Sequence, residues 1–138
     1  MMGDSVILVV GSLHHDILIE AETLPRRDET AVGRRWYPKF GGKGGNQALA
    51  ASRAGAGVRM LGAVGADDFG RFLLQGLDRA GVDRSWVRVL DGVGSGMSVA
   101  IQDARGDYAA AIVSGANLQI DPAELLRADL WAGVRLLI

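Results

Sequence analysis

An uninterrupted run of five aliphatic residues, Val6–Val10, constrains the fold more than any other feature of this sequence. A strand that faces solvent on one side alternates apolar and polar residues, whereas a strand of a parallel sheet is covered on both faces and is apolar throughout. A second apolar segment covers Val58–Val64, and Val134–Ile138 begins a third. Residues with helical periodicity lie between the first two and after the second, over 45–54 and 67–81. Strands alternating with helices predict an α/β fold built around a parallel sheet.

Two segments do not fit this alternation. Residues 16–40 contain two extended pieces joined by a turn-like stretch, and residues 95–114 contain two apolar or alternating pieces around Asp103–Asp107, which has hairpin chemistry. We expect them to form a small β-sheet lid that projects from the parallel sheet. Trp36, on a partly exposed strand, is a candidate subunit contact or a residue packed within the lid.

A further helix is predicted to begin after Asp121. The aspartate is a good N-cap, Pro122 occupies the first helical position, and Glu124 stands where a capping glutamate is favoured.

Composition excludes several classes of function. With 49% hydrophobic and 22% charged residues the chain is globular, and its net charge of −1 gives no reason to bind nucleic acid or an anionic membrane. It has no cysteine, which excludes disulfides, thiolate catalysis and cysteine-ligated metals. Val6–Val10 is too short for a signal-peptide core or a membrane span. We expect a cytoplasmic protein.

The segment from Gly41 to Gly45 holds four glycines in five residues and leads into an alanine-rich helix. Glycine lets a backbone approach a ligand closely, and the start of a helix offers unpaired N–H groups. Lys43 adds a cationic donor and Asn46 an amide. A P-loop is excluded because Gly44 follows Lys43, and no Rossmann fingerprint comes after the first strand. The pattern fits a ligand-binding loop and a tight strand-to-helix turn equally well.

Four motifs together resemble the N-terminal signature of the PfkB carbohydrate kinases. They are Gly41–Ala48 with its alanine-rich helix, Gly62–Gly70, Gly11-Ser12 followed by Asp16, and Gly115–Asn117, and they span nearly the whole chain in the family's order. The Gly-Gly-Lys-Gly-x-Asn form is typical of ribokinase-like members. The resemblance implies a partial ribokinase-like parallel-sheet core with a lid over about 16–40 and 95–114, and such lids often form a homodimer contact.

The resemblance also implies a sugar-binding site. It assigns contacts with sugar hydroxyls to Asp16, Gly42, Lys43 and Asn46. Candidate pocket-wall residues on the lid are Met97, Ser98 and Ile112, although these side chains could equally pack between lid and sheet. His14 stands where ribokinases usually have asparagine, so it is a further candidate contact and leaves ribose specificity open. Adjacent residues on an extended chain point opposite ways, so we expect no metal site at His14 and His15.

The catalytic half of such a kinase is not present in these residues. In the family, the general base, most of the ATP pocket and the loops for a monovalent cation such as K⁺ belong to the C-terminal half. We expect the full protein to be an ATP- and Mg²⁺-dependent sugar kinase, and residues 1–138 alone to be inactive and to form the N-terminal part of a longer chain. The alternatives are a nucleoside or fructose kinase of the same family, and a non-catalytic sugar-binding module.

Overall fold

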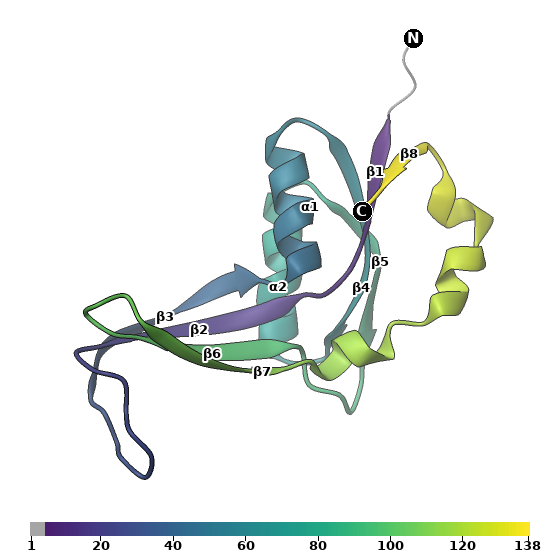
Figure 1. The fold of residues 1–138 in the computed structure, drawn as a ribbon. Helices are drawn as coiled ribbons and strands as arrows, with labels where there is room; N and C mark the ends of the chain where they lie inside the picture. The colour runs from purple at the N-terminus through teal and green to yellow at the C-terminus, as the bar shows by residue number, and fades with distance from the viewer. Residues whose placement is uncertain (1–4) are drawn as a thin grey trace.

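The computed structural model describes residues 5–138, in which two four-stranded sheets meet at an angle (Figure 1). The first sheet is entirely parallel, in the order β5-β4-β1-β8. Its strands are β1 Val6–Val10, β4 Gly57–Gly65, β5 Asp83–Leu90 and β8 Val134–Leu137. Two helices, α1 Lys43–Arg53 and α2 Asp68–Arg79, lie together on one side of it (Figure 1). The predicted α/β fold is confirmed.

Burial on both faces explains the apolar run in β1. Leu8 and Val9 are both fully buried, yet neighbouring side chains on a strand point to opposite faces. Val9 packs into the cluster formed with α1 and α2, whereas Leu8 packs against Leu130 on the other side of the sheet. Neither position tolerates a polar residue, and the periodicity of a half-exposed strand is therefore absent.

The second sheet has mixed pairing, in the order β3-β2-β6-β7. Its strands are β2 His14–Ala21, β3 Gly33–Gly41, β6 Met97–Gln102 and β7 Tyr108–Val113. Strand β2 pairs antiparallel with β3 and parallel with β6, and β6 forms a hairpin with β7. This sheet comes from the two segments expected to form a lid, and it extends away from the parallel sheet (Figure 1).

The helix predicted after Asp121 differs from the structure. Asp121 does cap the segment, since its carboxylate accepts a hydrogen bond from the Ala123 N–H at 2.9 Å. The capped segment, however, is a short 3₁₀ helix, Pro122–Leu126, flanked by two others at Gly115–Gln119 and Ala128–Trp131. A 3₁₀ helix rises further per residue than an α-helix. The three short helices can therefore carry the chain from the lid to β8 while burying only Ala116 and Leu130 among their residues.

No helix of residues 5–138 is long and apolar enough to cross a membrane.

Candidate substrate-binding site

The glycine loop packs directly against the turn after β1. A Cβ atom placed on Gly44 would lie 2.7 Å from the carbonyl carbon of Gly11, and one on Gly11 would lie 2.9 Å from the Gly44 Cα. The Gly45 N–H donates to the Ser12 carbonyl at 3.0 Å. Gly42 has a φ of +91° and is the N-cap of α1. The first turn of α1 is thus held against the β1–β2 junction by backbone contacts that side chains would prevent.

Asp16 is held in place from two sides. The β2–β6 register sets it opposite Ser98, whose hydroxyl donates to the Asp16 Oδ1 at 2.6 Å. On the other side, a Cβ on Gly41 would lie 2.7 Å from the Asp16 Cγ, so the carboxylate occupies space that a side chain at position 41 would fill. The glycine loop therefore provides room for the aspartate as well as flexibility for the backbone.

The loop and the aspartate share one cavity of about 500 Å³. All but one of the candidate site residues line it, namely His14, Asp16, Gly42, Lys43, Asn46, Ser98 and Ile112. Met97 does not. Successive residues of a strand face opposite sides of a sheet, so when Ser98 faces the cavity Met97 faces away from it, opposite His15. The expectation that Met97 faces the ligand is corrected by this alternation.

Asn117 is the main site residue that sequence reasoning left without a role. Its amide clamps the backbone of Leu13: the Leu13 N–H donates to Oδ1 at 2.9 Å, and Nδ2 donates to the Leu13 carbonyl at 2.9 Å. Nδ2 also donates to the Ser114 carbonyl at 2.8 Å. The remaining cavity residues that were not predicted are Ser12, Ser114 and Leu118. The sequence feature that could have identified Asn117 is its place in the motif Gly115–Asn117.

The cavity offers mixed hydrogen-bonding chemistry. Asp16 supplies acceptors, Lys43 supplies donors, and Asn46 and His14 supply both kinds of group. Within residues 5–138, the backbone N–H groups of Lys43 and Gly44 donate to no other protein group. The N–H of Lys43, which lines the cavity, is available at the start of the helix, where partial positive charge gathers. This combination suits a neutral ligand with several hydroxyls.

A second carboxylate, Asp67, fixes the loop that precedes β6. It caps α2 by accepting from the Gly70 N–H at 2.8 Å, and it also accepts from the Ser95 N–H at 2.9 Å and the Ser95 hydroxyl at 2.6 Å. Burial raises the pKa of Asp67, but these hydrogen bonds outweigh burial and hold the pKa below its usual range. Asp67 stands at the first position of the predicted helical range 67–81, and it is the N-cap of α2.

The adjacent histidines lie in different environments. His14 lines the cavity, whereas His15 is buried and stacks on Phe69 with ring centroids 4.0 Å apart. In the part of the chain that the structure describes, no group of three or more His, Cys, Asp or Glu side chains is placed to hold a metal ion.

Comparison with known proteins adds independent information. Residues 4–135 match the family described as pfkB family carbohydrate kinase. The chain is 38% identical to a ribokinase of Bacillus subtilis over 122 residues, which are 88% of this chain and 41% of that protein. The chain therefore spans about two fifths of that relative's length.

Two solved structures are similar in fold. One is Arabidopsis thaliana ribokinase complexed with ribose and ATP, with a TM-score of 0.75 and 31% identity over 83% of this chain and 37% of that one. The other is a nucleoside kinase of Burkholderia thailandensis in complex with inosine, with a TM-score of 0.71 and 29% identity over 83% and 37% of the two chains.

Proposed function

Because the chain belongs to the pfkB family of carbohydrate kinases, we propose that the protein of which it forms part transfers a phosphoryl group from ATP to a sugar hydroxyl, as ribokinases do. Residues 1–138 supply the sugar-binding side of that reaction. The observation that carries this proposal is the single cavity shared by Asp16 and the glycine loop. Had the loop faced away from the aspartate, the two parts of the motif could not act on one ligand.

Different residues of the cavity bind different parts of the sugar. Asp16 accepts hydrogen bonds from neighbouring sugar hydroxyls, because a carboxylate has about four lone-pair sites and Ser98 uses one of them. Lys43, Asn46 and the N–H groups at the start of α1 donate to sugar oxygens. Ile112, which also lines the cavity, covers an apolar face of the sugar ring.

The phosphoryl-transfer step needs groups that these residues do not supply. Catalysis of that step depends on positioning and on stabilising the charge of the transferring group. The described residues offer no acidic cluster for a metal ion. From the family to which the chain belongs, we propose that the general base, the ATP and Mg²⁺ site and any K⁺ site lie in residues outside 1–138, and that the full protein acts in the cytoplasm. Residues 1–138 alone should be inactive, and turnover of ATP with any sugar above background would refute that part of the proposal.

Binding measurements on the full-length protein test the site. Replacing Asp16 with Asn should weaken ribose binding by about 10- to 100-fold, because a hydrogen bond to a charged group contributes about 1.5–3 kcal/mol. Ser98→Ala should weaken it less, since it only frees the carboxylate. Asp91→Asn, which changes an exposed aspartate outside the cavity, is the matched control. Titration calorimetry measures all four proteins, and equal ribose affinity of parent and Asp16→Asn would refute the assignment.

A nucleoside kinase is the second candidate, and His14 is the observation that favours it. The imidazole lines the cavity close to Gly96, where a Cβ would lie 2.6 Å from its Cδ2. The imidazole offers a flat ring, and the exposed Leu118 lines the same cavity, so both can contact a base attached to the sugar. A thermal-shift panel of ribose, 2-deoxyribose, fructose and inosine separates the candidate substrates. A larger rise in melting temperature with inosine than with ribose would identify a nucleoside as the substrate.

We also propose that the lid pairs with a second copy of the chain. The β2–β3 register sets Ile19 opposite Trp36, on the face of the lid away from Asp16. Trp36 is 65% exposed there, beside a shallow cavity that Ile17 also lines. Light scattering of the parent and of Trp36→Lys tests this, and an unchanged mass for the variant would contradict it.

A further inference from the structure

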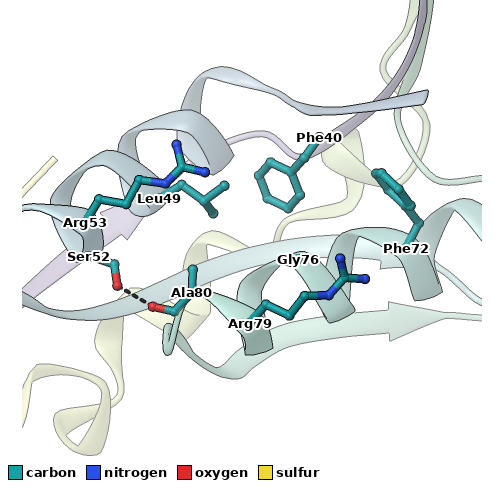
Figure 2. Close-up of a pocket in the computed structure, with 8 residues that line it drawn as sticks. All are labelled: Phe40, Leu49, Ser52, Arg53, Phe72, Gly76, Arg79 and Ala80. Carbon is teal, nitrogen blue, oxygen red and sulfur yellow. Dashed lines mark hydrogen bonds between the residues drawn. The ribbon is translucent and has the colours of Figure 1, made fainter. Parts of the chain in front are cut away.

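A second cavity, of about 440 Å³, lies between the two helices (Figure 2). It shares no lining residue with the candidate substrate cavity. Its walls come from α1, α2 and the end of β3, and they are formed by Phe40, Leu49, Ser52, Arg53, Phe72, Gly76, Arg79 and Ala80. The proposed kinase reaction gives this cavity no role.

The ring of Phe40 lines the cavity and packs against both helices. It is wedged between a glycine of each helix: a Cβ on Gly45 of α1 would lie 2.7 Å from its Cε1, and one on Gly76 of α2 would lie 2.8 Å from its Cε2. Beyond the ring, the Ser52 hydroxyl donates to the Ala80 carbonyl and links the two helices (Figure 2). The ring and this hydrogen bond both lie between the two helices.

The charged side chains at this cavity are both arginines, and each is the basic residue in the last turn of its helix. Arg53 extends from α1 and Arg79 from α2, and their guanidinium groups lie on either side of the Phe40 ring in the view of Figure 2. None of the described residues that line the cavity carries a carboxylate. Within residues 5–138, neither arginine forms an ion pair, and Arg79 has only a long contact of 3.5 Å with Gln75.

Most other arginines of the chain are neutralised by a nearby carboxylate. Ion pairs of this kind involve Arg26, Arg27, Arg34, Arg35, Arg59, Arg71, Arg84 and Arg127. By contrast, the two arginines at this concave apolar surface have no such partner among the described residues. Apart from the carbonyl ends of their own helices, nothing among the described residues offsets their positive charge, which is therefore open to a ligand.

We propose that this cavity is a binding site for an organic anion, consisting of a phosphate or carboxylate group attached to a flat apolar body. The rings of Phe40 and Phe72 and the side chain of Leu49 accept the apolar body, and the cavity volume lies in the range of small-molecule sites. The guanidinium groups of Arg53 and Arg79 reach the anionic group from the two sides of the Phe40 ring, and their planar arrangement of donors matches phosphate and carboxylate oxygens. The site is separate from the one that binds the sugar.

Phenyl phosphate, titrated into the full-length protein by calorimetry, tests the proposal. It should bind at least tenfold more tightly than inorganic phosphate, which lacks the apolar body, and than phenol, which lacks the charge. Arg53→Gln and Arg79→Gln should each weaken phenyl phosphate binding about tenfold, the value of one charge-assisted hydrogen bond. Both side chains are exposed on helix surfaces, so these changes leave the fold intact.

Two further variants separate this site from other anion sites. Arg88→Gln removes an exposed arginine of β5 that lies outside the cavity, and it should leave the affinity unchanged. Asp16→Asn should also leave it unchanged, even though that change weakens sugar binding. Equal binding of inorganic phosphate and phenyl phosphate would overturn the proposal. The proposal would also be overturned if a variant lacking both Arg53 and Arg79 kept the parent's affinity for phenyl phosphate. A loss of affinity in Arg88→Gln as large as in the Arg53 and Arg79 variants would overturn it too.

Discussion

Replacing Asn117 should loosen the chain where it enters the candidate site. The amide makes three hydrogen bonds, two to the backbone of Leu13 and one to the Ser114 carbonyl. The Leu13 side chain is fully buried, so its backbone groups have limited access to water. Asn117→Ala removes all three bonds and leaves the Leu13 N–H and carbonyl without their partner.

The geometry predicts an order of stability among the variants. Each lost hydrogen bond costs about 1 kcal/mol, so Asn117→Ala should lower the free energy of unfolding by about 3 kcal/mol. Asn117→Asp should lower the free energy of unfolding by about another 1–2 kcal/mol, although the aspartate side chain has nearly the same shape as the asparagine side chain. Its carboxylate would place an acceptor against two carbonyl oxygens, where Nδ2 now donates at 2.8 and 2.9 Å. As the pH falls through the pKa of that carboxyl, protonation restores a donor and the difference should shrink.

Urea denaturation followed by circular dichroism, at pH 7 and at pH 4, measures these differences. Gln119→Ala, an exposed change on the same 3₁₀ helix, is the matched control and should lie within about 0.5 kcal/mol of the parent. If Asn117→Asp proved as stable as Asn117→Ala at pH 7, the donor role assigned to Nδ2 would be wrong.

Three other predictions concern packing and pH. Gly44→Ala should lower the free energy of unfolding by about 1–3 kcal/mol, because its Cβ meets backbone that cannot move. Gly94→Ala, whose Cβ would meet nothing closer than 3.9 Å, should lower it little. Equal melting temperatures of the two variants would contradict this. His15→Leu should raise the free energy of unfolding by about 1 kcal/mol, because the buried Nδ1 of His15 has no hydrogen-bond partner among the described residues, and a lower melting temperature would refute it. Burial raises the pKa of Asp67 and of Asp83, but their hydrogen bonds outweigh it and lower both. The stability that these carboxylates provide should therefore be complete above about pH 4 and be lost as the pH falls through the lowered pKa values. Urea midpoints between pH 7 and pH 2 measure this loss, and Asp67→Asn should reduce it; a variant with the parent's pH dependence would argue against the role of Asp67.

Local patterns in the sequence determined the architecture of the parallel sheet. The run in β1 is apolar because its neighbouring residues, Leu8 and Val9, are buried on opposite faces. A position that is buried in the fold requires an apolar residue, so a strand buried on both faces can be recognised from a continuous apolar run in the sequence. The glycine loop was visible in the same way, as residues adjacent in sequence, whereas Asp16 was assigned through the resemblance to the PfkB carbohydrate kinases.

Only the tertiary structure decided how these parts meet. Ser98 reaches Asp16, and Asn117 reaches Leu13, across separations of 82 and 104 residues. Ser98 lines the cavity and Met97 does not, because strand register decides which of two neighbouring residues faces the cavity. Register is set by packing of whole strands, and no periodicity within either segment records it. The cavity between the helices has the same origin, because it exists only where Phe40 of β3 lies between glycines of α1 and α2.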